Sequence, residues 1–216
     1  MINFVKIFLL VIVVIFISSC ECNCKKIITI DEEPIIELIN AYSIDVEEPS
    51  GLDLSLDNLS LWTVSDKRRK MYQLDLTGQI LREVSIPGVD LEGITIDSNE
   101  ETIWVVQESL GEILQVDTLG NELQRILIPA VRDGAGGLEG ITINPTNNHL
   151  FMLKEKDPSV LIELNTEFET ILFKRISTAD DYSGMDYNEA ENELWIVSDQ
   201  ERTVYRYDLG GSILAS

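Results

Sequence analysis

The chain has 216 residues, 44% of them hydrophobic, which is enough to build the core of one ordinary domain. Its 38 acidic and 16 basic residues give a formal net charge of -22. A field of that sign repels nucleic acids and anionic lipid headgroups, so we expect no nucleic-acid partner. The composition favours a folded protein whose partners are cations, cationic ligands or neutral surfaces.

The N-terminus has the composition of an export signal. Residues 7–17 are an unbroken apolar run of eleven, the length of a secretory signal and short for a membrane span. The following Ile17-Ser18-Ser19-Cys20 resembles the bacterial lipobox, in which the cysteine becomes the lipid-bearing first residue after cleavage. We therefore expect residues 1–19 to be a lipoprotein signal peptide and Cys20 to carry the lipid anchor. An uncleaved signal anchor from about Ile2 is the alternative, and both hold the protein at the cell membrane, facing outside the cytoplasm.

A linker follows the signal. It spans residues 20–37 and contains all three cysteines, Cys20, Cys22 and Cys24. The Cys-x-Cys-x-Cys spacing has no companion histidine, so we do not interpret it as a metal site. The acidic run Asp31-Glu32-Glu33 keeps this segment solvated. We expect it to act as a lipid-anchored tether.

Residues 38–216 contain a fourfold repeat. Its copies start at glycines spaced by 42, 47 and 44 residues: Gly51, Gly93, Gly140 and Gly184. Eleven residues after each glycine stands a large aromatic residue: Trp62, Trp104, Phe151 and Trp195. Fifteen residues after each glycine stands an acid: Asp66, Glu108, Glu155 and Asp199. This period is typical of a propeller blade, so we predict an all-β fold, a β-propeller of four-stranded blades.

The first copy shows the predicted strands within a blade. They cover residues 51–56, 61–64, 71–76 and 80–86, and are separated by turn residues such as Asp57-Asn58. The large aromatic residue begins the second strand. We expect it to fill the space between adjacent blades and not to stack on a ligand.

The two ends of the repeat region indicate how the ring closes and how many repeats it contains. Residues 38–51 match residues 80–93 position for position, so we expect them to form an outer strand that completes the last blade and fastens the ring. The sequence ends at Ser216, inside the predicted fourth strand of the fourth copy. Four copies are able to close a ring, but the blade length suits a larger one, and we expect one or two further repeats.

Acidic residues are predicted to gather at one mouth of the central channel. The residues just before the repeat glycines are Ser50, Glu92, Glu139 and Ser183. If the strand that follows is innermost, these side chains surround one mouth. The second strand runs antiparallel to the first, so the acids fifteen residues after the glycines return to the same mouth.

A hard cation such as calcium would satisfy these convergent carboxylates, because it takes several oxygen ligands in irregular geometry. The candidate ligands are Glu92 and Glu139 first, followed by Asp66, Glu108, Glu155 and Asp199. The alternative is that the latter four only accept hydrogen bonds from loop amides. Both interpretations stay open from sequence.

Other catalytic motifs are scarce. The only histidine, His149, follows Asn147-Asn148, and we expect it to be an exposed turn residue. This placement argues against a Ser-His-Asp triad.

Several of these motifs resemble one bacterial family. They are Asp90-Leu91-Glu92-Gly93-Ile94-Thr95, Gly137-Leu138-Glu139-Gly140-Ile141-Thr142 and Leu194-Trp195-Ile196-Val197-Ser198-Asp199. In order, they resemble the SdiA-regulated (YjiK-like) family of bacterial envelope β-propeller proteins. The resemblance implies an exported, membrane-associated propeller of five or six blades with no established biochemical activity. More loosely, the blade start resembles that of calcium-dependent propeller lactonases and esterase-like phytases, where an acid matching Glu92 and Glu139 holds a central cation.

Two functions follow as hypotheses. The first is a membrane-tethered extracytoplasmic module that binds or scaffolds an unknown protein or small-molecule ligand, with calcium at the channel mouth. The second is a metal-dependent hydrolase of a lactone, ester or phosphoester, in which a rim carboxylate serves as the base for cation-bound water.

Overall fold

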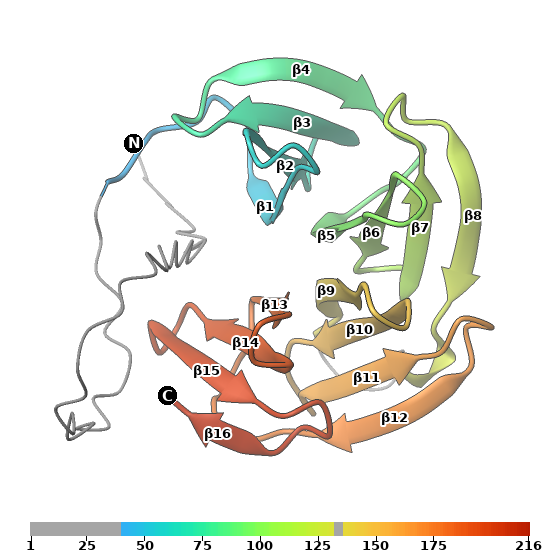
Figure 1. The fold of residues 1–216 in the computed structure, drawn as a ribbon, viewed down its shortest axis with the longest axis vertical. Coiled ribbons are helices and arrows are strands. Elements are labelled where there is room, and N and C mark those ends of the chain that lie inside the picture. Colours follow the sequence, from blue (N-terminus) through green and yellow to red (C-terminus); the bar gives the residue numbers. More distant parts are fainter. Residues whose placement is uncertain (1–39, 132–135) are drawn as a thin grey trace, which may run out of the picture.

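The computed structural model describes residues 40–131 and 136–216, which form four antiparallel sheets of four strands each. Within each sheet the strands follow one another in sequence order, so each sheet is one blade. Figure 1 shows the blades arranged around a common centre, with the first strand of each blade innermost. The predicted fold class, an all-β propeller of four-stranded blades, is confirmed.

The strand bounds follow the predicted repeat. Blade 1 consists of β1 (Pro49–Leu54), β2 (Ser60–Ser65), β3 (Lys70–Asp75) and β4 (Ile80–Ser85). Blade 2 consists of β5 (Leu91–Asp97), β6 (Thr102–Gln107), β7 (Glu112–Val116) and β8 (Glu122–Leu127), and is followed by a short 3-10 turn, η1 (Pro129–Val131). Blade 3 consists of β9 (Leu138–Asn144), β10 (His149–Lys154), β11 (Val160–Leu164) and β12 (Thr170–Arg175). Blade 4 consists of β13 (Gly184–Asn188), β14 (Glu193–Ser198), β15 (Thr203–Tyr207) and β16 (Ile213–Ala215).

The repeat glycines allow the innermost strands to approach closely. Strand β1 packs beside β5, β5 beside β9, and β9 beside β13. A Cβ atom added to Gly93 would lie 2.7 Å from the carbonyl oxygen of Glu139 and 2.9 Å from the amide nitrogen of Ile141, both on the next blade. A side chain at this position would therefore force the blades apart, which explains the recurrence of glycine.

The repeated aromatic residues pack between blades, as predicted. Trp62 lies in the apolar layer between blades 1 and 2 and is 4% exposed. Trp104 and Phe151 fill the next two layers, and the ring of Trp104 lies 5.6 Å from that of Phe168. Trp195 is only partly buried and belongs to none of the apolar clusters of the described residues. Three of the four aromatic residues thus stabilise blade–blade contacts.

The predicted outer strand before the first blade is not a strand in the described residues. The chain from residue 40 to residue 48 has no regular structure, and each blade has its own fourth strand. The predicted register nevertheless sets its packing. A Cβ atom on Gly78 would lie 3.2 Å from the carbonyl oxygen of Ser43, just as one on Gly120 would meet the carbonyl oxygen of Ser85. The segment occupies the place of a preceding blade's outer strand without the backbone hydrogen bonds of a sheet.

The membrane-related predictions concern another part of the chain. The predicted signal peptide at 1–19, the predicted lipidation site Cys20 and the linker at 20–37 all lie outside the described residues, which begin at Asn40. Among the described residues, none of the helical segments has the length and hydrophobicity to cross a bilayer.

Candidate functional site

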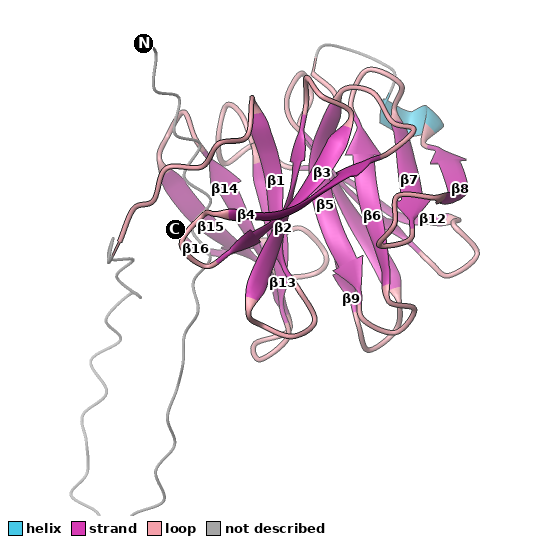
Figure 2. Cartoon of the chain, turned by 90° about the horizontal axis from the view of Figure 1, so that it is seen from above, coloured by secondary structure: helices cyan, strands magenta, loops and turns pink. Residues whose placement is uncertain are grey.

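The strand directions place the predicted acids at one end of the channel. Each blade begins at this end with its innermost strand, and its second strand returns there, so Pro49 pairs with Ser65 and Leu91 with Gln107. Figure 2 shows the connecting loops gathered at two opposite faces of the molecule. We call the face at which the innermost strands start the rim. The strand ends bring all six predicted acids to the rim, as expected, and four of them belong to groups of three carboxylates.

The first carboxylate group at the rim contains both leading candidates. One oxygen each of Glu92, Glu108 and Glu139 lies within 4.8 Å of the others. Glu92 is buried, and the other two are partly buried. Glu92 and Glu139 come from β5 and β9, and Glu108 follows β6, so the three residues span two blades. This spacing allows three carboxylates to contact one cation.

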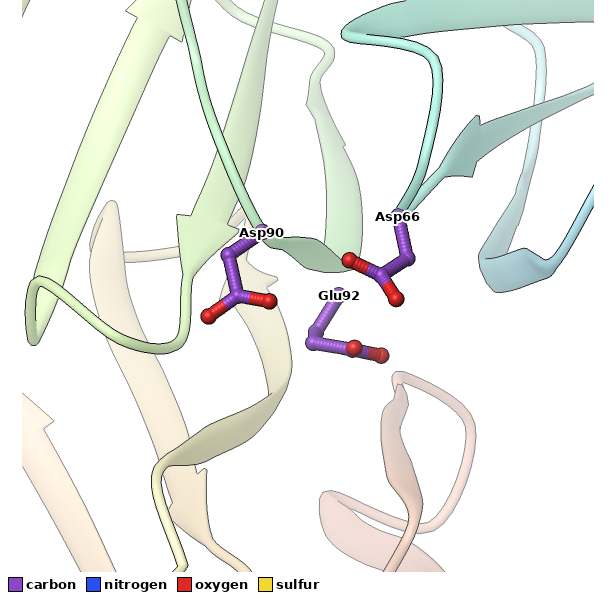
Figure 3. Close-up of side chains that lie close together, drawn as sticks. All are labelled: Asp66, Asp90 and Glu92. Atoms are coloured by element: carbon purple, nitrogen blue, oxygen red, sulfur yellow. The ribbon is translucent and has the colours of Figure 1, made fainter.

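A second group shares Glu92 with the first. Asp66 and Asp90 each have an oxygen within 4.8 Å of Glu92 and of each other. Figure 3 shows these three side chains gathered at the rim. Asp90 lies three residues before the repeat glycine, and its Oδ2 accepts a hydrogen bond from the amide of Ser109 at 2.8 Å. The two groups form a continuous acidic surface from blade 1 to blade 3.

Local contacts hold these carboxylates in place. The hydroxyl of Ser50 donates a hydrogen bond to Glu92 across the blade boundary. The amide of Gly137 donates to Oε1 of Glu108 at 3.0 Å. Burial, followed by the charge of Asp90, raises the pKa of Glu108. The hydrogen bond from the amide of Gly137 agrees with the alternative that Glu108 only accepts hydrogen bonds from loop amides. It lowers the pKa of Glu108 by less than burial and the charge of Asp90 raise it.

The last two predicted acids lie at the rim but outside both three-carboxylate groups. Glu155 forms an ion pair with Lys156, with 2.5 Å between Oε1 and Nζ. Asp199 neighbours Asp181, whose pKa is raised by burial and further by Asp199. Asp181 also accepts a hydrogen bond from the hydroxyl of Ser198 at 2.7 Å. Neither Glu155 nor Asp199 joins a three-carboxylate group among the described residues.

A second set of polar residues, which was not predicted from the sequence, lies at the other end of the innermost strands. Two residues after each repeat glycine stand Asp53, Thr95, Thr142 and Asp186. The amide of Ile96 donates to Oδ2 of Asp53 at 2.7 Å, which links blade 1 to blade 2. The only signal in the sequence was a polar residue at the same position of every copy.

The carboxyl groups of Asp53 and Asp186 face the same cavity, which also opens to solvent. Burial and the charge of Asp186 raise the pKa of Asp53 to about 7, although the amides of Ile96 and Leu54 act in the opposite direction. Burial also raises the pKa of Asp186, whose side chain is accessible to solvent within the cavity. The carboxyl group of Asp53 therefore changes its charge near neutral pH.

The single histidine lies away from the rim. His149 is the first residue of β10, at the opposite end of that strand from Lys154 and the rim. It is partly buried instead of exposed, and its Nδ1 lies 2.7 Å from Oε1 of Glu163. Its position gives it no contact with the carboxylate groups at the rim.

Comparison with known proteins identifies the family of the chain and supports its propeller fold. The model of the SdiA-regulated family matches residues 38–216. A streptogramin B lyase structure is 19% identical, with a TM-score of 0.56, and the match covers 80% of this chain and 55% of that one. A catalytically inactive virginiamycin B lyase from Staphylococcus aureus, with quinupristin, is 18% identical with a TM-score of 0.55, over 77% of this chain and 54% of that one.

A further match is a protein of unknown function from Bacteroides caccae, 15% identical with a TM-score of 0.50, over 72% of this chain and 56% of that one. The chain thus spans about half the length of these solved structures. At these identities the similarity shows the propeller fold alone. No curated protein sequence matches this chain.

Proposed function

The chain belongs to the SdiA-regulated family, and we propose that its propeller is a ligand-binding or scaffolding module, tethered to the cell membrane outside the cytoplasm, with calcium bound at the rim. The calcium proposal rests on the two clusters of three carboxylates that share Glu92. Five acids from three blades converge there. A cation would relieve their mutual repulsion and would stabilise the contacts between blades.

The donor set fits a hard ion. Calcium takes six to eight oxygen ligands, and carboxylates supply one or two each. Glu92, Glu108 and Glu139 would hold the ion, and Asp66 and Asp90 would complete the site or hold a second ion. The ion would supply a fixed positive charge at the mouth, to which an anionic or carbonyl group of a ligand is attracted.

Calcium titration tests this proposal. The free energy of unfolding of the full-length protein should rise by about 2.7 kcal/mol at 100 times the dissociation constant, and a chelator should reverse the gain. Exchanging both Glu92→Gln and Glu139→Gln keeps the side-chain size, removes two charges and should abolish the gain. Glu191→Gln, on an exposed turn between β13 and β14, is the matched control. Absence of a calcium effect on the wild type, or an equal effect in the double variant, would refute the calcium site.

The membrane tether is tested separately. It is supported by the lipobox-like sequence before Cys20 and by the apolar run at residues 7–17. Mass spectrometry of the N-terminus of protein produced in a bacterial host should show a lipid-modified Cys20, and Cys20→Ser should release the protein from the membrane fraction. An unmodified Cys20 in membrane-bound protein would contradict the lipid anchor.

One observation favours a second candidate, a metal-dependent hydrolase. The pKa of Glu108 is raised within the same group of carboxylates, which suits a base that takes a proton from water near a cation. Turnover of a lactone, ester or phosphoester panel that is lost in Glu108→Gln and retained in Glu191→Gln would support it, and no turnover by the wild type would refute it. We do not propose a lyase activity, because the similarity to lyases shows the fold alone and covers about half of their length.

A further inference from the structure

A cavity opens at the end of the channel opposite the rim. Its volume is about 140 Å³, which is more than a single water molecule needs and less than a drug-sized ligand fills. Its walls combine carboxyl groups, hydroxyl groups and aliphatic side chains: Asp53, Thr95, Ile96, Thr142, Ile143 and Asp186. Lysine, arginine and histidine are absent from the described residues that line it. The cavity has the size of a ligand's head group.

The backbone fixes the orientation of both carboxyl groups. Asp53 accepts hydrogen bonds from the amides of Leu54 and Ile96, each at 2.7 Å. Asp186 accepts one from the amide of Tyr187 at 2.9 Å, and the hydroxyl of Thr142 lies 3.4 Å from the same oxygen. A carboxylate has about four acceptor positions, so each group keeps capacity for a further donor. The pocket is thus built before any ligand arrives.

The chemistry of the walls selects a class of ligand. Two carboxyl groups in one partly enclosed cavity repel each other when both are ionised, and a cation placed against both would remove that cost. The candidate ligands at the rim are carboxylates, whereas this cavity also offers aliphatic side chains and threonine hydroxyl groups. Such a mixture suits an organic cation that has both N–H donors and a hydrocarbon stem.

We propose that this distal cavity binds the head group of a primary ammonium or guanidinium ligand, against Asp53 and Asp186. The N–H groups donate to the two carboxylates and to the threonine hydroxyl groups. The first methylene groups of the ligand contact Ile96 and Ile143. This site is independent of the calcium proposed for the rim.

Titration of the full-length protein with n-butylammonium and n-butylguanidinium, followed by amide NMR, tests the site. Saturable shifts are expected at Ile96, Thr142 and Tyr187. Asp186→Asn should weaken binding about tenfold or more, the loss expected for one charge-assisted hydrogen bond. Affinity should rise from about pH 6 to about pH 8, because Asp53 loses its proton in this range. Asp186, Tyr187 and Glu189 are the other titratable groups that line the cavity.

The controls separate the site from general attraction to an acidic protein. Asp45→Asn removes one exposed charge outside the cavity and should leave affinity unchanged. Tetramethylammonium has the same charge without N–H donors, and n-butanol has the stem without the charge, so both should bind at least tenfold more weakly. The rim variant Glu92→Gln with Glu139→Gln should bind n-butylammonium as the wild type does.

Three results would overturn the proposal: no saturable shift in the wild type up to about 100 mM ligand, equal binding by Asp186→Asn, or equal binding of n-butanol. If Asp53→Asn fails to fold, Asp186→Asn decides the outcome, because its side chain is accessible to solvent.

Discussion

Replacing Asp53 by asparagine should make the stability of the protein less dependent on pH. The folded state raises the pKa of Asp53 from 3.8 to about 7, chiefly through burial, with Asp186 adding to it. The folded protein therefore binds this proton more tightly than the unfolded chain. The resulting stability is fully present below the unfolded pKa and is lost as pH rises through about 7.

The magnitude follows from the shift. A raise of about three pKa units corresponds to at most about 4 kcal/mol, of which up to about 3 kcal/mol is lost between about pH 5 and about pH 8. Asparagine carries no charge but has only one acceptor atom, so one of the amides of Leu54 and Ile96 loses its partner, which costs about 1 kcal/mol. From about pH 5 to about pH 8, the free energy of unfolding of Asp53→Asn should therefore rise relative to that of the wild type by up to about 3 kcal/mol.

Urea denaturation monitored by tryptophan fluorescence at the two pH values measures this difference. Asp45→Asn serves as the control, because Asp45 is exposed and does not line the cavity. Its stability should run parallel to that of the wild type. A constant difference between Asp53→Asn and the wild type at both pH values would refute the reasoning.

Three further predictions concern the same architecture. Gly93→Ala should lower the free energy of unfolding by about 2 kcal/mol or more, because the new Cβ would lie 2.7 Å from a backbone oxygen. Gly210→Ala is the control and should change it by less than about 0.5 kcal/mol, because the nearest contact there is 3.4 Å. Equal effects of the two substitutions would contradict the close approach of the strands at Gly93. Trp104→Ala should cost about 3 to 5 kcal/mol in a urea titration and Trp195→Ala less than half of that, since only Trp104 is fully buried. Asp186→Asn should lower the pKa of Asp53 in an NMR titration, and an unchanged value would show that the two carboxyl groups do not interact.

The repeat predicted the architecture well because it is carried by residues with one physical role in every copy. The recurring glycine and the aromatic residue eleven positions later both report contacts between blades, and three of the four aromatic residues are buried there. The convergence of Glu92, Glu108 and Glu139 also followed from strand direction alone. Residues 40–48 were harder, because their register is that of an outer strand but no neighbouring strand pairs with them.

The distal residues escaped prediction for a different reason. Asp53 and Asp186 look like ordinary members of an alternating strand, and their importance arises only when blades 1 and 4 are brought to the same cavity. The burial of Asp53 and its repulsion by Asp186 arise only from this arrangement of the blades. His149 shows the same limit, because its partner Glu163 lies on the adjacent strand and could not be inferred from the turn sequence around it.

The glycine connects the two candidate sites. Because a Cβ at this position would collide with the next blade, the innermost strands are held at backbone contact, and their other side chains must point along the channel or into the layers between blades. The residue before the glycine then reaches the rim, and the residue two positions after it reaches the distal cavity. Glu92 and Asp53 thus belong to two sites set by one spacing, and a substitution that separates the innermost strands, such as Gly93→Ala, should weaken both calcium and ammonium binding. Loss of one with full retention of the other would show that the two sites are not built on the same contact.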